Sequence, residues 1–467
     1  MDNESMSNQH DSPVQEHFSK LQRFRQAAYG LITKGRDALF ELSDAVLQMP
    51  RVQCFAELSC APAFRRKWPS VYEALQDGRL NRGELCKLYL LQFSSSHPLI
   101  LALDHTAWPR VWANTLCERS YQHQPSPLPG HRPVTIGHGY STLAIVPEAN
   151  GSWALPVLHE RISQQSPVQQ AAAQLQAVCP LLAVRPCCLL DAEYGCAPYL
   201  LATADLAVDH LIRLRGNLAL EGPPPAYKGR GRHPIHGPKF CFKDPATWPE
   251  PDEIQAGEDA QSGPFTARIW HTLRFSKALN CPMRVACLER PNAAGTRRKP
   301  KIVWFAWVGQ PPPPAWWQRY CRRYPIDHWY RFAKGRLHWL EPKVATPQQA
   351  ELWSDLMPFL TWELWLARLV APDQPLPWQK AQPTLTPGRV CQGMPSILAA
   401  IGSPTQVCKP RGKSPGWPKG RARTHRERYD PLRSEREKLR KDRQGTRTIG
   451  LKTNSLPANS NAPPPIA

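Results

Sequence analysis

The sequence predicts an α/β protein whose core is interrupted by a β-rich insertion, with a helical domain before it and a basic tail after it. Over residues 98–220, apolar strand-like runs alternate with helical segments in the order βββαβαβ. Between 221 and 314 the helical pattern disappears, Pro and Gly cluster, and short strand-like runs follow one another. Helical periodicity then returns from 315 to 372.

Length and composition limit the classes to which the chain can belong. Its 467 residues predict two to four structural units, and a hydrophobic content of 42% allows a sizeable core. The sequence contains no apolar run of about 20 residues, so it predicts no transmembrane helix. The polar, acidic N-terminus does not resemble a signal peptide. We therefore expect a soluble, cytoplasmic protein with no membrane partner.

The N-terminal region is expected to be helical. Residues 1–16 are predicted to be disordered, and apolar residues recur at helical spacing over 17–95. The segment 69–78 begins with Pro-Ser and ends at Gly78, as a short helix does. With Arg65 and Arg66 nearby, this domain is predicted to bind DNA; the alternative is a helical cap that only packs against the core.

The core elements follow in order. Continuous apolar runs at 98–108 and 186–194 suit strands that are buried on both faces. Two further strands are expected between them, followed by an Ala/Gln/Leu-rich helix at 166–182. A helix over 195–208 and a strand over 209–220 complete the series. The boundaries that we predict are a first core segment at 96–220, a β-rich insertion at 221–314, a second core segment with the catalytic helix at 315–372, a Pro-rich helical segment at 373–408 and a basic, largely disordered tail at 409–467.

The charge of the chain favours a polyanionic partner. The net charge is +21 and the isoelectric point is near 9.6, which places double-stranded DNA first among the expected partners. Between Lys409 and Lys452 there are sixteen Lys or Arg residues and five acidic ones. About half of the net charge therefore lies in a tail that would attract phosphates without regard to sequence.

The fourteen cysteines do not predict a metal or disulfide framework. None of them forms a C-x2-C pair, whereas zinc modules normally place two ligands two to four residues apart and repeat that pair downstream. We interpret the cysteines as reduced thiols, most of them buried.

Three acids are the candidate catalytic residues. Asp104 and Asp191 each end an apolar strand-like run, and Asp327 lies in the pattern Y-x2-R-x3-D-x6-K, which Tyr320, Arg323 and Lys334 complete. Carboxylates are the oxygen ligands that hold two Mg²⁺ (or Mn²⁺) ions for phosphodiester cleavage. Pro325 fits the first turn of a helix, which places Asp327 at the positive end of the helix dipole and Lys334 two turns further on the same face.

With these residues the chain resembles the bacterial insertion-sequence DDE transposases, whose third acid lies in a Tyr–Arg–Glu–Lys signature of the same spacing. The Tyr-Gly after Asp191 also matches that family, and the resemblance covers roughly residues 50–420. It implies an RNase H-like fold that brings Asp104 and Asp191 onto neighbouring strands. It also implies that Asp104 bridges two metal ions and that Asp191 and Asp327 complete the two metal sites.

The departure from the family is Asp327, where the signature has Glu. Its side chain is one methylene shorter, about 1.5 Å of reach, and metal sites tolerate little slack. Either the helix lies closer, or another acid such as Glu341 or Glu351 serves, or the enzyme is impaired.

Several residues are candidates for contacts with DNA. Tyr320, Arg323 and Lys334 are expected at phosphates near the cleaved bond. Arg230 and Arg232 lie in a Gly-rich basic segment that resembles minor-groove-binding loops, as does Arg411-Gly-Lys413; a solvated loop is the alternative. Related enzymes trap a flipped base with a tryptophan of the insertion, a role open to Trp270 or Trp304, although a core position is favoured for both.

The resulting prediction is a cut-and-paste transposase that cleaves the inverted repeats of an insertion sequence and joins them to target DNA. Two ends would be held by a homodimer associated with the nucleoid. The alternatives are an impaired or repurposed transposase that only binds DNA, and a structure-specific nuclease with the same core.

Overall fold

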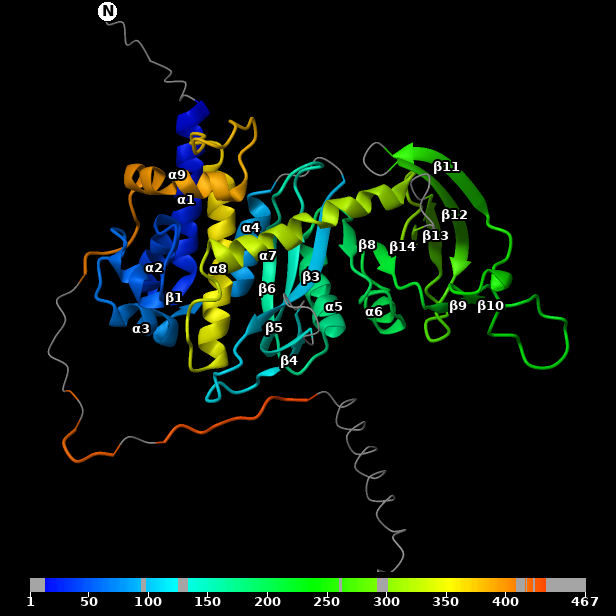
Figure 1. Cartoon of the computed structure of the whole chain (residues 1–467), viewed down its shortest axis with the longest axis horizontal. Helices are drawn as coiled ribbons and strands as arrows, with labels where there is room; N and C mark the ends of the chain where they lie inside the picture. Colours follow the sequence, from blue (N-terminus) through cyan, green and yellow to red (C-terminus); the bar gives the residue numbers. More distant parts are fainter. Residues whose placement is uncertain are drawn as a thin grey trace, which may run out of the picture.

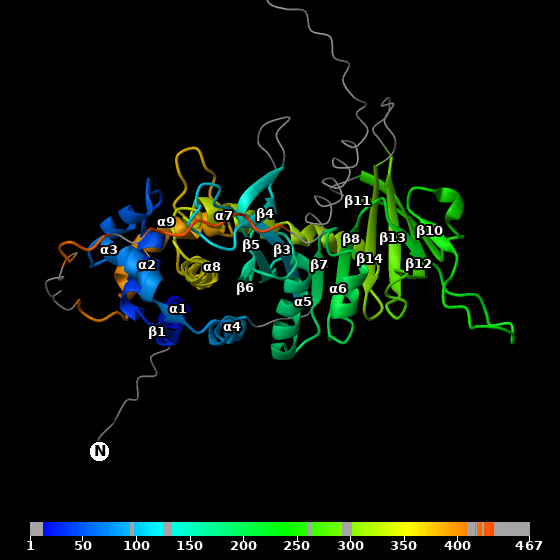
Figure 2. The same ribbon diagram turned by 90° about the horizontal axis from the view of Figure 1, so that it is seen from below.

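The computed structural model describes residues 13–93, 98–124, 133–259, 263–291, 301–408, 416, 418–422 and 425–433. Helices gather at one end of the molecule and a large sheet extends to the other (Figures 1 and 2). None of the helices in the described residues combines the length and apolar character needed to cross a bilayer. The fourteen cysteines are free, and seven of them are buried.

One mixed sheet of ten strands runs through the molecule. Its order is β11-β12-β13-β14-β8-β7-β3-β5-β4, and β6 pairs with β5. Strands β3, β7 and β8 are parallel to one another. Strand β5 is antiparallel to β3, and β6 is antiparallel to β5. The strands are β3 (Ile100–Pro109), β4 (Ser120–His123), β5 (Val134–Ile145), β6 (Leu155–Ile162), β7 (Cys187–Leu190), β8 (Asp209–Leu214), β11 (Glu253–Asp259), β12 (Gly263–Leu273), β13 (Met283–Arg290) and β14 (Lys301–Val308).

Two helices cover opposite faces of this sheet. Ser141 on β5 donates a hydrogen bond to Gln174 of α5 (Pro167–Val178), at 2.7 Å. The next residue, Thr142, accepts one from Tyr330 of α7 (Pro325–Gly335), at 2.8 Å. Because successive side chains of a strand point to opposite faces, α5 and α7 sandwich the sheet. Figure 2 shows this arrangement, with α5 below the strands.

The strands from the expected insertion continue the core sheet rather than forming a sheet of their own. β14 pairs antiparallel with β8, from Trp304 opposite Leu214 to Val308 opposite His210. The prediction of one strand over 209–220 was wrong, because β8 ends at Leu214 and a turn follows. The chain then forms β9 (Ala219–Glu221), which pairs with β10 (Lys239–Cys241) in a separate small sheet.

Two other local predictions need correction. The helix expected over 195–208 is confined to α6 (Ala197–Ala202), since the Thr203 hydroxyl bonds back to the carbonyl of Tyr199 at 2.9 Å and turns follow. Strand β4 was not predicted, because Ser-Tyr-Gln-His lacks the apolar alternation of a half-buried strand.

The helical end is built around α8 (Pro347–Ala367), which is buried along most of its length. A capping box of Thr346 and Gln349 begins this helix. Around it lie α1 (Pro13–Leu31), α2 (Arg36–Gln48), α3 (Pro69–Asp77), α4 (Arg82–Leu91) and α9 (Pro387–Ile401). The short helix predicted at 69–78 is confirmed as α3. Disorder was predicted up to residue 16, but α1 already begins at Pro13; residues 1–12 lie outside the described ranges.

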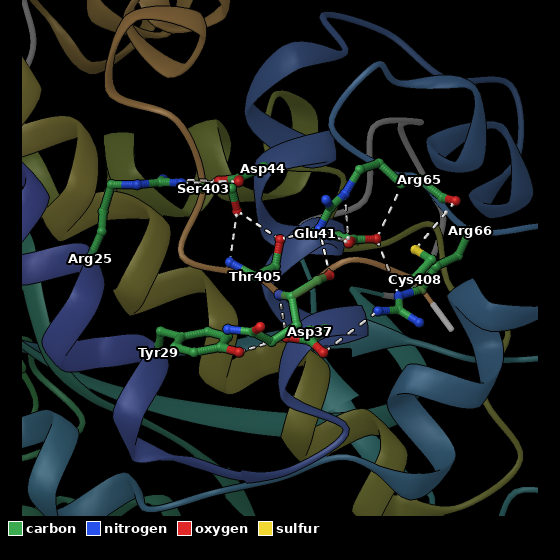
Figure 3. A network of polar contacts seen from close by, with 11 residues as sticks. Arg25, Tyr29, Asp37, Glu41, Asp44, Arg65, Arg66, Ser403, Thr405 and Cys408 are labelled. Atoms are coloured by element: carbon green, nitrogen blue, oxygen red, sulfur yellow. Dashed lines mark hydrogen bonds and ion pairs between the residues drawn. The ribbon is translucent and has the colours of Figure 1, made fainter. Parts of the chain in front are cut away.

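A polar network ties the segment after α9 to the N-terminal helices (Figure 3). Arg65 donates to Thr405 Oγ1 at 2.5 Å, and Asp37 accepts from the backbone N–H of Gln406 at 3.2 Å. Deeper in the same region, the buried Arg25 bridges Asp44 of α2 and Glu363 of α8. Charged groups that are this buried are stable only when they are paired.

A piece of the tail that was expected to be largely disordered is bound to the sheet. The backbone N–H of Tyr429 donates to the Asn114 carbonyl at 2.8 Å, and that of Leu432 to the Arg119 carbonyl at 2.6 Å. The Arg119 guanidinium, itself buried, donates to the Tyr429 carbonyl at 2.7 Å. Residues 425–433 therefore lie beside β4. Residues 434–467 and Arg411-Gly-Lys413 are outside the described ranges.

Candidate active site

The first two candidate acids meet on neighbouring parallel strands. Asp104 lies in the middle of β3, and Asp191 directly follows β7. The register pairs Leu103 with Leu190, so the two aspartates occupy the next position on strands about 4.8 Å apart. Ile100–Leu103 and all of β7 are buried, which explains why the sequence there is continuously apolar.

The third acid lies where a 3-10 helix leads directly into an α-helix. Tyr320 and Arg323 lie in the 3-10 helix η4 (Trp316–Arg323), whereas Asp327 and Lys334 lie in α7. Pro325 begins α7, and Asp327 is in its first turn, as the sequence predicted. The signature therefore spans two helical segments that meet at Tyr324, whose own backbone is helical (φ −55°, ψ −30°).

Arg323 joins two of the three acids. Its guanidinium donates to Asp104 Oδ2 at 2.9 Å and to Asp327 Oδ2 at 3.1 Å. The arginine side chain is only 9% exposed, whereas that of Asp327 is 41% exposed. Arg323 thus lies between the acids and balances their charge from the buried side. A contact between this arginine and a DNA phosphate stays a prediction.

The other residues of the signature also face the acids. The Tyr320 hydroxyl donates to Asp191 Oδ1 at 3.3 Å. The Lys334 ammonium donates to Thr106 Oγ1 at 2.6 Å, two residues beyond Asp104 on the same face of β3. All four signature residues therefore lie along one face of β3 and β7, whether or not they contact DNA.

Burial and mutual repulsion shift the protonation of this cluster. Burial raises the pKa of Asp327, with Arg323 opposing the rise and Asp104 and Asp191 adding to it. Burial also lowers the pKa of Lys334 to about 8, against a smaller opposing pull from Asp104. The pKa of Arg323 is raised by Asp104 and the surrounding acids, although burial opposes the rise. The cluster therefore holds more negative charge than one arginine relieves.

The donor chemistry of this cluster fits divalent cations. Three carboxylates face one another, and their mutual repulsion is what a bound cation would relieve. Within the described residues, no three His, Cys, Asp or Glu side chains are grouped closely enough to hold a metal ion, and Tyr320 and Arg323 bond to Asp191 and Asp104. Asp104 and Asp327 share the arginine and are the first candidates to hold a cation.

The remaining sequence candidates lie apart from this cluster. Arg230 and Arg232 are exposed on the extended loop between β9 and β10, where Gly229 and Gly231 take positive φ values of 80° and 81°. Trp270 and Trp304 are both buried in an aromatic cluster with Phe240, so the core position favoured for them is confirmed.

The two acids considered as replacements for Asp327 contribute nothing visible to the site. Glu351 lies in the first turns of α8 and forms an ion pair of 2.7 Å with Arg161 of β6. Glu341 lies beyond the end of α7. Asp327 is the acid that η4 and α7 bring to Asp104.

Sequence reasoning missed several polar neighbours of the acids. Tyr330 is buried and donates to the Asp104 carbonyl at 2.8 Å. His105 lies 3.6 Å from Glu193 and 3.3 Å from the Tyr194 hydroxyl. Tyr330 could have been found from the helical spacing, because it lies three residues after Asp327 and four before Lys334. The contacts of His105 depend on the pairing of β3 with β7, which the spacing along the chain does not reveal.

Fold and site together define a class: a mixed α/β protein with a carboxylate cluster on two central parallel strands and one covering helix. The family model of the DDE superfamily endonucleases matches residues 29–273. The chain belongs to this family, and it is an enzyme of the nuclease and transposase type. The match includes Asp104 and Asp191 and ends before Asp327.

Two further comparisons complete this result. The structure is similar to a piggyBac transposase in a synaptic complex with hairpin DNA, at 10% sequence identity and a TM-score of 0.34, over 87% of this chain and 77% of that one. A TM-score this low does not establish a shared fold. Among curated protein sequences, none matches the chain.

Proposed function

We propose that this enzyme is a cut-and-paste transposase that cleaves DNA at the inverted repeats of an insertion sequence and transfers the freed strand to a target. The observation that carries the proposal is the convergence of Asp104, Asp191 and Asp327 through Arg323 and Tyr320. Membership in the DDE superfamily endonucleases supports the nuclease step.

The strand order supports an RNase H-like core for this proposal. Taken in chain order, β3, β5, β6, β7 and β8 are the five core strands, and in space they lie in the order β6-β5-β3-β7-β8. The first three are antiparallel and the last two are parallel to β3. A β-rich insertion, β9–β14, then separates β8 from the helix that supplies the third acid.

In the proposed mechanism, Asp104, Asp191 and Asp327 would hold two Mg²⁺ or Mn²⁺ ions. When bound, such ions supply an activated water and stabilise the leaving oxygen. Water attack breaks the P–O3′ bond and leaves a 3′-hydroxyl and a 5′-phosphate. The 3′-hydroxyl would then attack a phosphodiester of the opposite strand, which closes a hairpin and releases the 3′-oxygen of the flanking DNA as a hydroxyl. A second water attack would reopen the hairpin, and the regenerated 3′-hydroxyl would attack a phosphodiester of the target and release one 3′-oxygen of the target as a hydroxyl.

The protein would contribute positioning and charge. Arg323 releases one carboxylate as cations enter, and its guanidinium then faces the DNA backbone. Lys334 at Thr106 would bind a phosphate near the cleaved bond, and Tyr320 would hold Asp191 in place. Arg230 and Arg232 on their exposed loop would contact DNA outside the site. Two such chains, one at each end of the element, would form the complex in the cytoplasm, on nucleoid DNA.

A strand-transfer experiment tests this function. DNA that carries the ends flanking the gene is incubated with the protein, Mn²⁺ and a supercoiled target plasmid. We expect joined products that depend on the flanking ends. Cleavage of many branched DNAs without joining would instead indicate a structure-specific nuclease.

The second candidate is a transposase that retains DNA binding and has lost cleavage. Asp327 favours it, because its shorter side chain reaches less far than the Glu of the family signature. Under this alternative, Asp327→Glu restores cleavage to a chain that only binds its ends.

A further inference from the structure

A pocket with two arginines on its rim lies directly beside Asp191. The cavity has a volume of about 600 Å³ and is lined by Asp191, Arg213, Arg215, Asn217 and the β14 residues Ile302–Trp304, among others. Its size lies within the range of small-molecule and cofactor sites, about 300–1,000 Å³. The pocket is therefore large enough for a portion of a bound substrate next to a candidate catalytic acid.

The sheet register explains why the arginines are there. The parallel pairing of β7 with β8 places Leu190 beside Ile212, so the next neighbours are Asp191 and Arg213. Arg213 and Arg215 are two residues apart and share one face of the chain at the end of β8. The residues between and before them, Ile212 and Leu214, are buried on the other face.

The face that carries Arg213 is the one on which the candidate site lies. Phe305 is the cross-strand partner of Arg213 and packs against Tyr320, with ring centroids 5.0 Å apart. Tyr320 in turn donates to Asp191. Arg213 is thus close to the residue that holds the second acid.

The charge of both arginines is available. Arg213 and Arg215 are exposed, and across the described residues neither guanidinium has an ion pair or hydrogen bond with another side chain. Arginines with a structural role in this protein hold acids, as Arg185 does at Asp209 and Arg161 does at Glu351. Arg213 and Arg215 are not used in this way.

We propose that this pocket binds a phosphate of the DNA strand adjacent to the phosphate that is cleaved, with Arg213 and Arg215 as its ligands. A guanidinium group can donate two parallel hydrogen bonds to a phosphate. The carboxylates of the site would repel the same phosphate, so the arginines are its candidate ligands. The strand would then leave the site across the ends of β7, β8 and β14. This inference rests on the proposed function, because it takes the acids as the point of cleavage.

The first test measures DNA binding without cleavage. A labelled duplex carrying one flanking end is titrated in EDTA over a series of salt concentrations, with native protein and with Arg213→Gln/Arg215→Gln. Log K falls as log salt rises, and each lost phosphate contact reduces the magnitude of that negative slope by about 0.9. We expect the magnitude of the slope to fall by about one, and to stay unchanged for Lys277→Gln, which removes a charge from the turn between β12 and β13.

The second test locates the phosphate. Single methylphosphonates, which lack the negative charge, are placed in turn on each side of the cleavage position. A methylphosphonate at one position should weaken DNA binding by the native protein about tenfold, and the same substitution should not change DNA binding by the double variant. An unchanged salt slope, or equal sensitivity of both proteins at every position, would overturn the inference. Because no cleavage is required, a native chain that shows this coupling but never cleaves would contradict the proposed function alone.

Discussion

Arg323 and Asp104, which lie on η4 and β3 and are 219 residues apart in sequence, are joined by a hydrogen bond of 2.9 Å between guanidinium and carboxylate. The same guanidinium reaches Asp327 at 3.1 Å. The arginine of the signature therefore serves as the counter-ion of two candidate metal ligands. Its removal and the addition of cations should act on the same two carboxylates.

Replacing Arg323 with Met should destabilise the protein by about 2–3 kcal/mol at pH 7. The variant leaves two facing carboxylates without their counter-ion, and breaking a buried pair costs about 3–5 kcal/mol. The partial exposure of Asp327 reduces that loss. Urea unfolding measures it, with Arg331→Met, which replaces an exposed arginine of α7, as the control. Equal stability of the two variants would show that Arg323 does not neutralise the acids.

Divalent cations should reverse this loss. Mg²⁺ or Mn²⁺ at about 100 times its dissociation constant stabilises the folded state by about 2.7 kcal/mol, and Arg323→Met should gain at least as much as the native chain. Asp104→Ala should gain much less. Thermal unfolding with and without the ions checks this. The same rise in melting temperature for Asp104→Ala would place the cations elsewhere.

The contribution of Lys334 to DNA binding should depend on pH. Burial lowers the pKa of Lys334 from 10.5 to about 8, so the ammonium is protonated at pH 7 and loses its proton as the pH rises through about 8. The native chain should bind DNA about tenfold more tightly than Lys334→Met at pH 7, the worth of one charged hydrogen bond. Phosphate binding favours the protonated form, so this advantage should be lost between about pH 8 and pH 10.

A matched variant separates this effect from other titrations. Lys334→Arg keeps its charge over the whole range, so its affinity relative to Lys334→Met should not fall with pH. Fluorescence anisotropy at constant ionic strength provides the measurement. A native advantage that is independent of pH would contradict the assigned contact.

The ionic cluster between α1, α2 and α8, of which Figure 3 shows Arg25 and Asp44, should be essential to the helical end. Arg25→Met leaves the buried carboxylates of Asp44 and Glu363 without a counter-ion. We expect a loss of about 3–5 kcal/mol at pH 7. Burial already raises the pKa of Asp44 while Arg25 opposes the rise, so in the variant that pKa rises further and acid protonates the carboxylates. The loss should therefore be smaller at pH 5 than at pH 7 in urea unfolding; an equal loss at both would contradict it.

The candidate acids could be found in the sequence because their local signals are strong. Continuous apolar runs identify strands buried on both faces, and Asp104 and Asp191 end such runs. Pro325 marks the start of α7 and thus the position of Asp327. These features depend on neighbours along the chain, which periodicity and helix-capping rules describe well.

What the sequence did not reveal depends on pairing between distant segments. The addition of β14 to β8 extends the core sheet, and no pattern within 301–308 specifies its partner. Arg213 and Arg215 acquire meaning only beside Asp191, through the register of β7 with β8. The docking of Tyr429 on Asn114 uses backbone groups, which leave no trace in side-chain composition.

The central claim is that Asp104, Asp191 and Asp327 together hold the metal ions of a DNA-cleaving site. Cleavage of DNA with the gene's flanking ends, in Mg²⁺ or Mn²⁺, tests it most directly when the native chain is run beside Asp104→Ala and Asp327→Glu. We expect metal-dependent cleavage by the native chain and a loss of more than about 100-fold in Asp104→Ala, beyond the 10–100-fold typical of residues that only support a ligand. Cleavage that survives in Asp104→Ala would contradict it.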